Sequence, residues 1–169
     1  MTLREATTAK HKMAEQMPFN QKMLKGELSK EEYVKYLNSQ FSIFYCIENL
    51  LTLPENFIRI NRILSDIHEL TNRDHVEINV LEGVKKYCEH LKSLNTEIIW
   101  AHVYLNYMAL LFGGQMLQKQ VPGSGKMFDF ENSHTIISAI REKQKDEWAD
   151  EVNKGFDFMI EIFQELNNN

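Results

Sequence analysis

Apolar residues recur every three or four positions along most of this chain, with polar residues between them. That spacing places the apolar side chains on one face of an α-helix, whereas a half-buried strand would alternate at every second residue. No segment shows convincing strand alternation, and Gly and Pro, with 7 and 3 copies, are scarce. The pattern therefore predicts an all-α fold in which residues 1–169 form a single multi-helix domain.

Two capping boxes mark where helices should begin. The pairs are Thr2 with Glu5 and Ser29 with Glu32. At this spacing, the side chain of each residue can accept a hydrogen bond from the backbone amide of the other. They predict helices that start at Leu3 and just after Ser29. Further helices are expected over 55–70 with Pro54 in the first turn, and after Asn72 to about Leu94. Another should run from Asn95 or Thr96 to before Pro122, and two segments should follow from Asn132 or Ser133 to about Leu166.

Composition narrows the class of protein. A net charge of −5 and an isoelectric point near 5.7 argue against nucleic acid as the main partner. No apolar run reaches the roughly 18 residues that a membrane span needs, and the charged start of the chain does not resemble a signal peptide. Cys46 and Cys88 lie far apart without a CxxC motif, which favours core thiols in a reducing compartment. We therefore expect a cytoplasmic protein with no membrane segment.

The histidines offer two candidate metal sites. His11 precedes Glu15 by one helical turn, so the carboxylate could accept one ring N–H and leave the other nitrogen for a metal. The same spacing is also typical of a pair on a helix surface. His68 and His75 are seven residues apart, which suits a solvated surface better than a ligand pair. The surface is also expected for His90, and His134 lies near the start of a helix with no visible partner.

Adjacent glycines interrupt an apolar segment that is otherwise strongly helical. Gly113 and Gly114 lie in HVYLNYMALLFGGQ, residues 102–115, and each costs about 1 kcal/mol relative to Ala inside a helix. They could let two helices cross closely, or they could let a flat ligand lie against the backbone. Haem is such a ligand, and one axial histidine with an open opposite face suits O₂ chemistry.

In several blocks spread over nearly its whole length, the chain resembles the haem oxygenases. The resemblance implies that haem lies between the first helix and a kinked distal helix that carries Gly113 and Gly114. It also puts His11 in the place of the axial iron ligand and Glu15 in the place of its hydrogen-bonding partner. The blocks that carry it are LREATTAKHKMAE (3–15), KGELSKEEYVKYLNSQFSIFYCIE (25–48), KKYCEHLKSLNTEIIWAHVY (85–104), FGGQMLQK (112–119), GKMFDFEN (125–132) and GFDFMIEIFQEL (155–166).

The resemblance further implies an activity. O₂ and an external electron donor would open the porphyrin ring to biliverdin, CO and free iron, so that haem is both cofactor and substrate. The length is similar to that of compact bacterial or phage members, so we expect a monomer with ferredoxin as the donor. A basic docking surface for an acidic ferredoxin could be formed by Lys10, Lys12, Lys22 and Lys25.

The family's propionate anchors carry over in part. Arg4 occupies a position that is basic in the family, and Tyr104 matches a tyrosine at the haem edge. Arg141 stands for a propionate-binding arginine, with Lys143 and Lys145 as alternatives because this chain is shorter in that region. A cation beside each propionate is what a haem edge near solvent requires.

The distal side departs from the family. Leu110 stands where many members carry an aspartate that organises the waters delivering protons, and Phe112 replaces a small polar residue. Asn106 or Tyr107 could order those waters instead. Two other hypotheses remain open: a haem-binding or haem-sensing protein without turnover, and a thiaminase-like or di-iron protein of the same helical superfamily.

Overall fold

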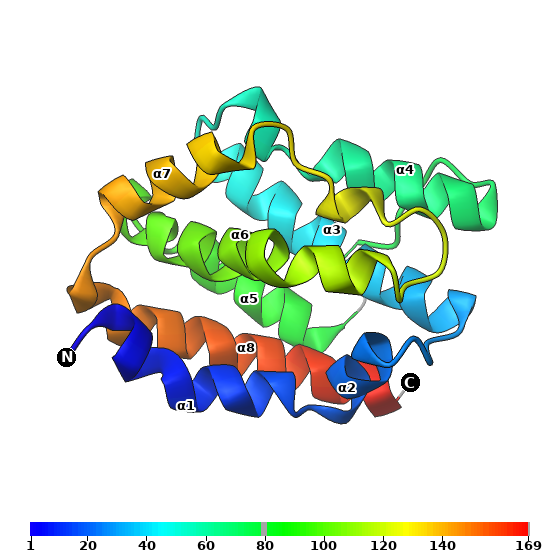
Figure 1. The fold of residues 1–169 in the computed structure, drawn as a ribbon, viewed down its shortest axis with the longest axis horizontal. Helices are drawn as coiled ribbons and strands as arrows, with labels where there is room; N and C mark the ends of the chain where they lie inside the picture. Colours follow the sequence, from blue (N-terminus) through cyan, green and yellow to red (C-terminus); the bar gives the residue numbers. More distant parts are fainter. Residues whose placement is uncertain (79–80, 169) are drawn as a thin grey trace.

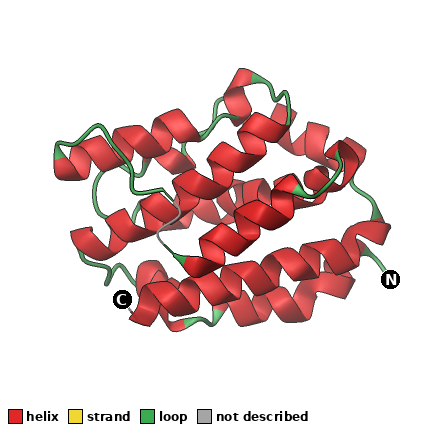
Figure 2. Cartoon of the chain, turned by 180° about the vertical axis from the view of Figure 1, so that it is seen from behind, coloured by secondary structure: helices red, strands yellow, loops and turns green. Residues whose placement is uncertain are grey.

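A computed structural model describes residues 1–78 and 81–168, and the described residues contain helices and loops but no β-strand (Figures 1 and 2). The expected all-α, single-domain architecture is confirmed. No helix within the described ranges combines the length and apolar character that crossing a membrane requires. The elements are α1 (Leu3–Glu15), α2 (Pro18–Leu24), α3 (Lys30–Leu50), η1 (Glu55–Phe57), α4 (Ile60–Thr71), α5 (Glu82–Lys92), α6 (Thr96–Gln118), η2 (Lys126–Phe128), α7 (Ser133–Lys143), η3 (Asp146–Trp148) and α8 (Ala149–Asn168).

Both predicted capping boxes are present. The Thr2 hydroxyl accepts from the Glu5 amide at 3.2 Å, and the Ser29 hydroxyl accepts from the Glu32 amide at 3.1 Å. Asn95 caps α6 in the same way, since its Oδ1 accepts from the Ile98 amide at 3.0 Å. These local sequence signals therefore fix the starts of α1, α3 and α6.

The helix predicted over 55–70 is wrong in its first turn. Pro54 precedes the short 3-10 helix η1, Ile58 is extended, and α4 begins only at Ile60. The cause is a tertiary contact, because the Arg59 amide donates to the carboxylate of Glu48 on α3 at 3.0 Å. A carboxylate from another helix satisfies an amide at the start of α4 that would otherwise need a local cap.

The helix predicted to follow Asn72 and run to about Leu94 is also too long. Asn72 adopts the left-handed conformation (φ 57°) and ends α4, residues 73–78 are not helical, and α5 begins at Glu82. Positions 79–80 of that prediction lie outside the described residues. The start of α5 is set from a distance, since Glu165 of α8 accepts from the amides of Glu82 (3.0 Å) and Gly83 (2.5 Å).

Helix α8 runs between α1 and α6 (Figure 1) and packs against both, and also against α5. A β-carbon at Gly155 would stand 2.4 Å from Leu105 of α6 and 3.2 Å from the His102 ring, so this glycine permits the α6–α8 crossing. A small apolar cluster that includes Leu3, Leu105 and Phe156 fills the space among α1, α6 and α8. A second, larger cluster lies mainly among α3, α4, α5 and α6.

Two side chains from the region of α4 hold the segment around η2. Arg59 is 1% exposed and donates through Nη1 to the carbonyls of Met127 (3.0 Å) and Asp129 (2.5 Å). Asp66 accepts from the amides of Lys126 (2.8 Å) and Met127 (2.9 Å). The segment is thereby pressed against α6, which positions the residues discussed next.

Candidate functional site

His11 and Glu15 lie together on the exposed side of α1. Their side chains are 56% and 54% exposed, and His11 Nε2 is 3.5 Å from Glu15 Oε1. That separation is an ion-pair contact and is too long for a good hydrogen bond, so the expected hydrogen bond is not formed in this conformation. The His11 ring also packs edge-on against Phe156 of α8, with centroids 5.7 Å apart. Sequence reasoning missed Phe156 as a neighbour of the candidate axial ligand.

The two glycines have different surroundings. A β-carbon at Gly113 would meet nothing within 4 Å among the described residues, apart from its own helix backbone. A β-carbon at Gly114 would stand 3.0 Å from Cδ1 of Phe128 in η2. Neither glycine therefore marks a helix crossing: Gly114 makes room for an aromatic ring, and Gly113 faces open space. Helix α6 continues through both residues, and the expected kink stays a prediction.

An exposed apolar strip surrounds Gly113. Phe112 and Met116 are 62% and 71% exposed, and Ala109, one turn before Gly113, is also exposed. Ala109 and Gly113 share one helix face because residues four apart are neighbours. A strip with two nearly absent side chains and large apolar side chains beside it is suited to a flat apolar ligand.

Basic groups lie near Tyr104, the residue considered for the haem edge. Burial raises the pKa of the Tyr104 hydroxyl, and the positive charges of Arg4 and Arg141 oppose that rise. The three residues come from α1, α6 and α7, so the fold brings them together from distant parts of the sequence. Arg141 also lies 5.8 Å from the centroid of the Phe112 ring, and Lys143 Nζ lies 4.9 Å from that of Trp100.

Three of the residues considered for the distal side, Leu110, Tyr107 and Asn106, are buried. Leu110 is 5% exposed and belongs to the larger apolar cluster. Tyr107 donates its hydroxyl to Glu48 at 3.1 Å. Asn106 donates from Nδ2 to the Tyr87 hydroxyl (2.9 Å) and to the His102 carbonyl (2.8 Å), while its Oδ1 has no hydrogen-bond partner within the described structure.

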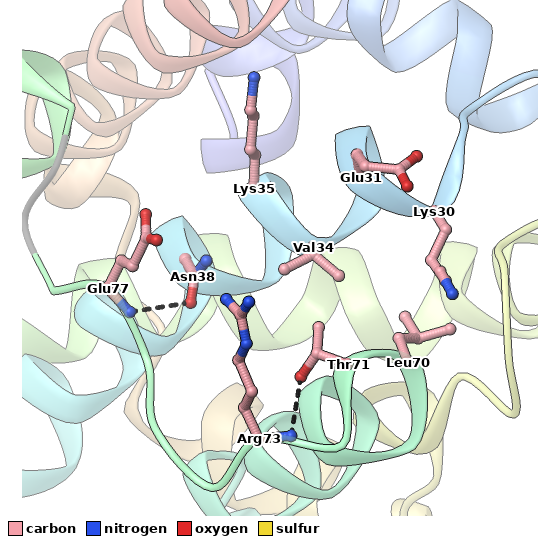
Figure 3. A pocket seen from close by; sticks show the side chains of 9 residues that line it. All are labelled: Lys30, Glu31, Val34, Lys35, Asn38, Leu70, Thr71, Arg73 and Glu77. Carbon is pink, nitrogen blue, oxygen red and sulfur yellow. Dashed lines mark hydrogen bonds between the residues drawn. The ribbon is translucent and has the colours of Figure 1, made fainter.

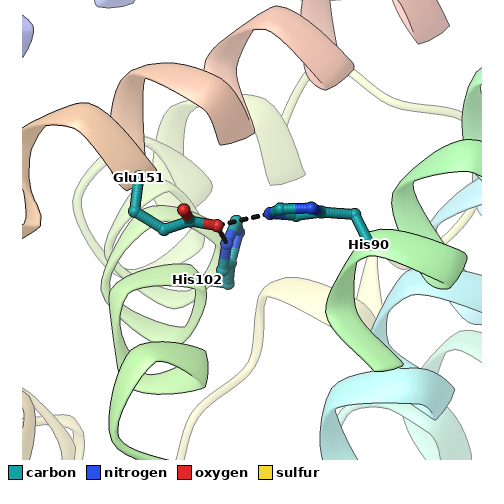
Figure 4. Close-up of side chains that lie close together, drawn as sticks. All are labelled: His90, His102 and Glu151. Atoms are coloured by element: carbon teal, nitrogen blue, oxygen red, sulfur yellow. Dashed lines mark hydrogen bonds and ion pairs between the residues drawn. The ribbon is translucent and has the colours of Figure 1, made fainter. Parts of the chain in front are cut away.

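The expectation that His90 lies on the surface is wrong. Its side chain is 14% exposed and contacts Glu151 of α8, which also accepts from His102 of α6 (Figure 4). The sequence prediction did not consider His102 or Glu151. The available signal was the position of His102 inside an apolar helix, four residues before Asn106. Of the other histidine candidates, His68 pairs with Asp74 at 2.7 Å.

A separate cavity of about 420 Å³ lies between α3 and the end of α4 (Figure 3). It contains none of the predicted site residues. Most of the residues that line it are charged or polar, and Asn38 accepts there from the Glu77 amide at 3.1 Å. The lining residues are Lys30, Glu31, Val34, Lys35, Asn38, Leu70, Thr71, Arg73 and Glu77.

The known proteins that this chain resembles in sequence are heme oxygenases. A sequence profile described as "Heme oxygenase" matches residues 1–165. Heme oxygenase of Porphyra purpurea is 26% identical over 98% of this chain and 85% of its own length. Heme oxygenase 1 of Gallus gallus is 25% identical over 97% of this chain and 68% of its own length.

Solved structures share the fold. The heme complex of heme oxygenase-1 from the cyanobacterium Synechocystis superposes with a TM-score of 0.86 at 22% identity, over 99% of this chain and 91% of that one. Heme oxygenase from Leptospira interrogans gives a TM-score of 0.80 at 23% identity, over 98% of this chain and 100% of that one. Because the family profile matches nearly the whole length, this chain belongs to the haem oxygenase family.

Proposed function

We propose that this protein is an active haem oxygenase, which uses O₂ and reducing equivalents to cleave haem to biliverdin, CO and iron. In this family haem is both substrate and prosthetic group. The proposal depends mainly on His11, which is exposed on α1 one turn before Glu15. It is supported by the open space beside Gly113, which lies next to an exposed apolar strip of α6.

The residues present fit haem on three counts. The space beside Gly113 accommodates a group that lies flat against the helix, and the exposed Phe112 and Met116 offer apolar contact. Arg4 and Arg141, which act electrostatically on Tyr104, supply positive charge for two carboxylates. His11 supplies an imidazole that is accessible enough to bind iron.

Haem, when bound, supplies the iron that activates O₂ and the ring that is cut. His11 would hold the iron through one ring nitrogen, and Glu15 would accept the N–H of the other, which fixes the tautomer. Phe156 limits where the His11 ring can move, because it packs against one side of that ring.

Proton delivery falls to Asn106 in this proposal, because Leu110 cannot hydrogen-bond. Asn106 precedes Gly113 by seven residues, about two turns, so both lie on one face of α6. Its Oδ1 lacks a protein partner and is free to accept a hydrogen bond from a water molecule. Tyr107 is the weaker candidate, since Glu48 already accepts from its hydroxyl.

We assign ferredoxin as the electron donor and a monomer as the working form. Of the lysines expected to form the docking surface, Lys10 pairs with Asp157 at 2.5 Å and Lys22 pairs with Glu32 at 2.8 Å. Lys12 and Lys25 are exposed. Docking of an acidic partner would therefore depend more on the latter two residues.

The experiment is single-turnover spectroscopy. The protein is loaded with haemin, then given ferredoxin, its reductase and O₂, and biliverdin and CO are measured. We expect the haem bands to decay as biliverdin forms. Intact haem after many equivalents of reductant, with neither product detected, would overturn the enzyme assignment and favour haem binding without turnover.

A further inference from the structure

Metal-ligating side chains from three helices meet at one point in the bundle. His90 comes from α5, His102 from α6 and Glu151 from α8 (Figure 4). Both imidazoles direct Nε2 at the same carboxylate oxygen, Oε1 of Glu151; the His102 contact is 2.8 Å, and His90 is also in hydrogen-bond contact. One ligating atom from each residue lies within 4.8 Å of the other two.

We propose that His90, His102 and Glu151 bind a divalent first-row transition-metal ion, for which Zn²⁺ is the probe. Two imidazoles and a carboxylate are a donor set that Zn²⁺ and Fe²⁺ accept. This site is distinct from the His11 position, and it rests on residues that the proposed haem chemistry does not use.

The contact between His102 and Glu151 needs little movement to admit an ion. A tetrahedral ion with bonds of about 2.05 Å sets its ligand atoms about 3.3 Å apart. The 2.8 Å between His102 Nε2 and Glu151 Oε1 would widen by roughly half an ångström to reach that separation. Glu151 lies in the first turn of α8 and is 21% exposed, so its carboxylate can make this shift.

The protonation states already suit a cation. Burial lowers the pKa of His102, which favours the neutral imidazole that a metal binds. Hydrogen bonds from His102 and His90 lower the pKa of Glu151 to about 2, so its carboxylate is ionised. The nearby ammonium of Lys154 also favours neutral His102, although its charge opposes a bound cation.

The ring nitrogen of His102 that would not bind the metal already has a hydrogen-bond partner. The Tyr87 hydroxyl lies 2.7 Å from His102 Nδ1, and Asn106 Nδ2 donates to that hydroxyl at 2.9 Å. A hydroxyl can accept as well as donate, so Tyr87 can support the tautomer that leaves Nε2 for the metal. His102 is fully buried while His90 and Glu151 are partly exposed, which leaves a solvent side where water can complete the coordination.

The test is equilibrium dialysis of the haem-free chain against Zn²⁺, with bound zinc per protein measured by mass spectrometry. The unsubstituted protein should bind one zinc ion. His90→Ala and Glu151→Gln should each weaken binding at least about tenfold. His11→Ala and His68→Ala, which remove exposed histidines elsewhere, should keep the zinc ion.

Folding is checked in the same samples by circular dichroism. Glu151→Gln preserves side-chain shape and can still hydrogen-bond, so it tests the ligand even if His90→Ala unfolds the chain. The proposal is overturned if no zinc binds, if Glu151→Gln binds it unchanged, or if only His11→Ala or His68→Ala loses it. Any of these results would leave a hydrogen-bonded His–Glu–His contact alone, and would not affect the haem assignment.

Discussion

The ring of Phe128 occupies the space next to Gly114: a β-carbon there would lie 3.0 Å from Cδ1 of that ring. Arg59 and Asp66 hold the η2 segment that carries Phe128, so the ring cannot withdraw freely. Gly113, the adjacent residue, faces no such neighbour in the described structure. Gly114 is therefore required for packing, whereas Gly113 leaves the space in which the proposed ligand would lie.

Substitution of Gly114 should lower the stability of the protein, whereas substitution of Gly113 should lower its affinity for haem. Gly114→Leu should cost about 1–3 kcal/mol of stability, because the larger side chain overpacks against Phe128. Gly113→Leu should leave stability equal or up to about 1 kcal/mol higher, since Leu favours helix, while haem affinity falls at least about tenfold because Leu fills the open space. Thermal melts and haemin titrations measure both. Unchanged haem affinity in Gly113→Leu would remove this face from the site.

Removal of the axial imidazole should leave the fold intact. His11→Ala should fold normally, because the side chain is exposed, but it should lose the spectrum of histidine-ligated ferric haem. Added imidazole should restore that spectrum in part. His68→Ala is the matched control, since His68 is equally exposed and also pairs with a carboxylate; if the two variants give the same spectrum, His11 is not the ligand.

The basic residues near Tyr104 should act on the propionates. Arg4→Ala and Arg141→Ala should each weaken haem binding by about 1.5–3 kcal/mol, the usual contribution of a hydrogen bond to a charged group. The loss should disappear when haem dimethyl ester replaces haem, because the ester lacks the two negative charges. Arg62→Ala, whose side chain pairs with Glu131 at 3.6 Å, is the control; equal losses with haem and ester would refute the assignment.

Asn106 should govern turnover more than binding. Asn106→Leu should slow ring opening about tenfold or more by removing the acceptor for a proton-delivering water, while haem affinity stays within about twofold of the original protein. Asn153→Leu makes the same change at a partly buried residue whose buried Oδ1 also lacks a partner. Single-turnover rates that match in the two variants would show that Asn106 has no special role.

Tyr107 should matter for stability in a pH-dependent way. Burial raises the pKa of Glu48, and the hydrogen bonds from the Arg59 and Ile60 amides and the Tyr107 hydroxyl oppose that rise. Tyr107→Phe removes a bond made to the ionised carboxylate, so it should cost about 1–3 kcal/mol near neutral pH. The cost should shrink as acid protonates Glu48 in the folded protein, below its raised pKa. Urea unfolding at about pH 7.5 and about pH 4.5 tests this; a cost that grows in acid would contradict it.

Local sequence determined the helical class and several helix starts. The capping side chains of Thr2, Ser29 and Asn95 act on amides only three residues away, so no tertiary contact is needed for them to work. The His11–Glu15 pair was predictable for the same reason, because one helical turn brings the two side chains together in any α-helix.

Tertiary structure decided what depends on residues far apart in the chain. The start of α5 depends on the carboxylate of Glu165, and the start of α4 depends on that of Glu48, because each carboxylate accepts from a backbone amide there. Gly113 and Gly114 are alike in sequence, yet only packing against Phe128 tells them apart. His90, His102 and Glu151 meet because α5, α6 and α8 pack together. Helical periodicity specifies which face of each helix is buried, but not which side chain of another helix it will meet.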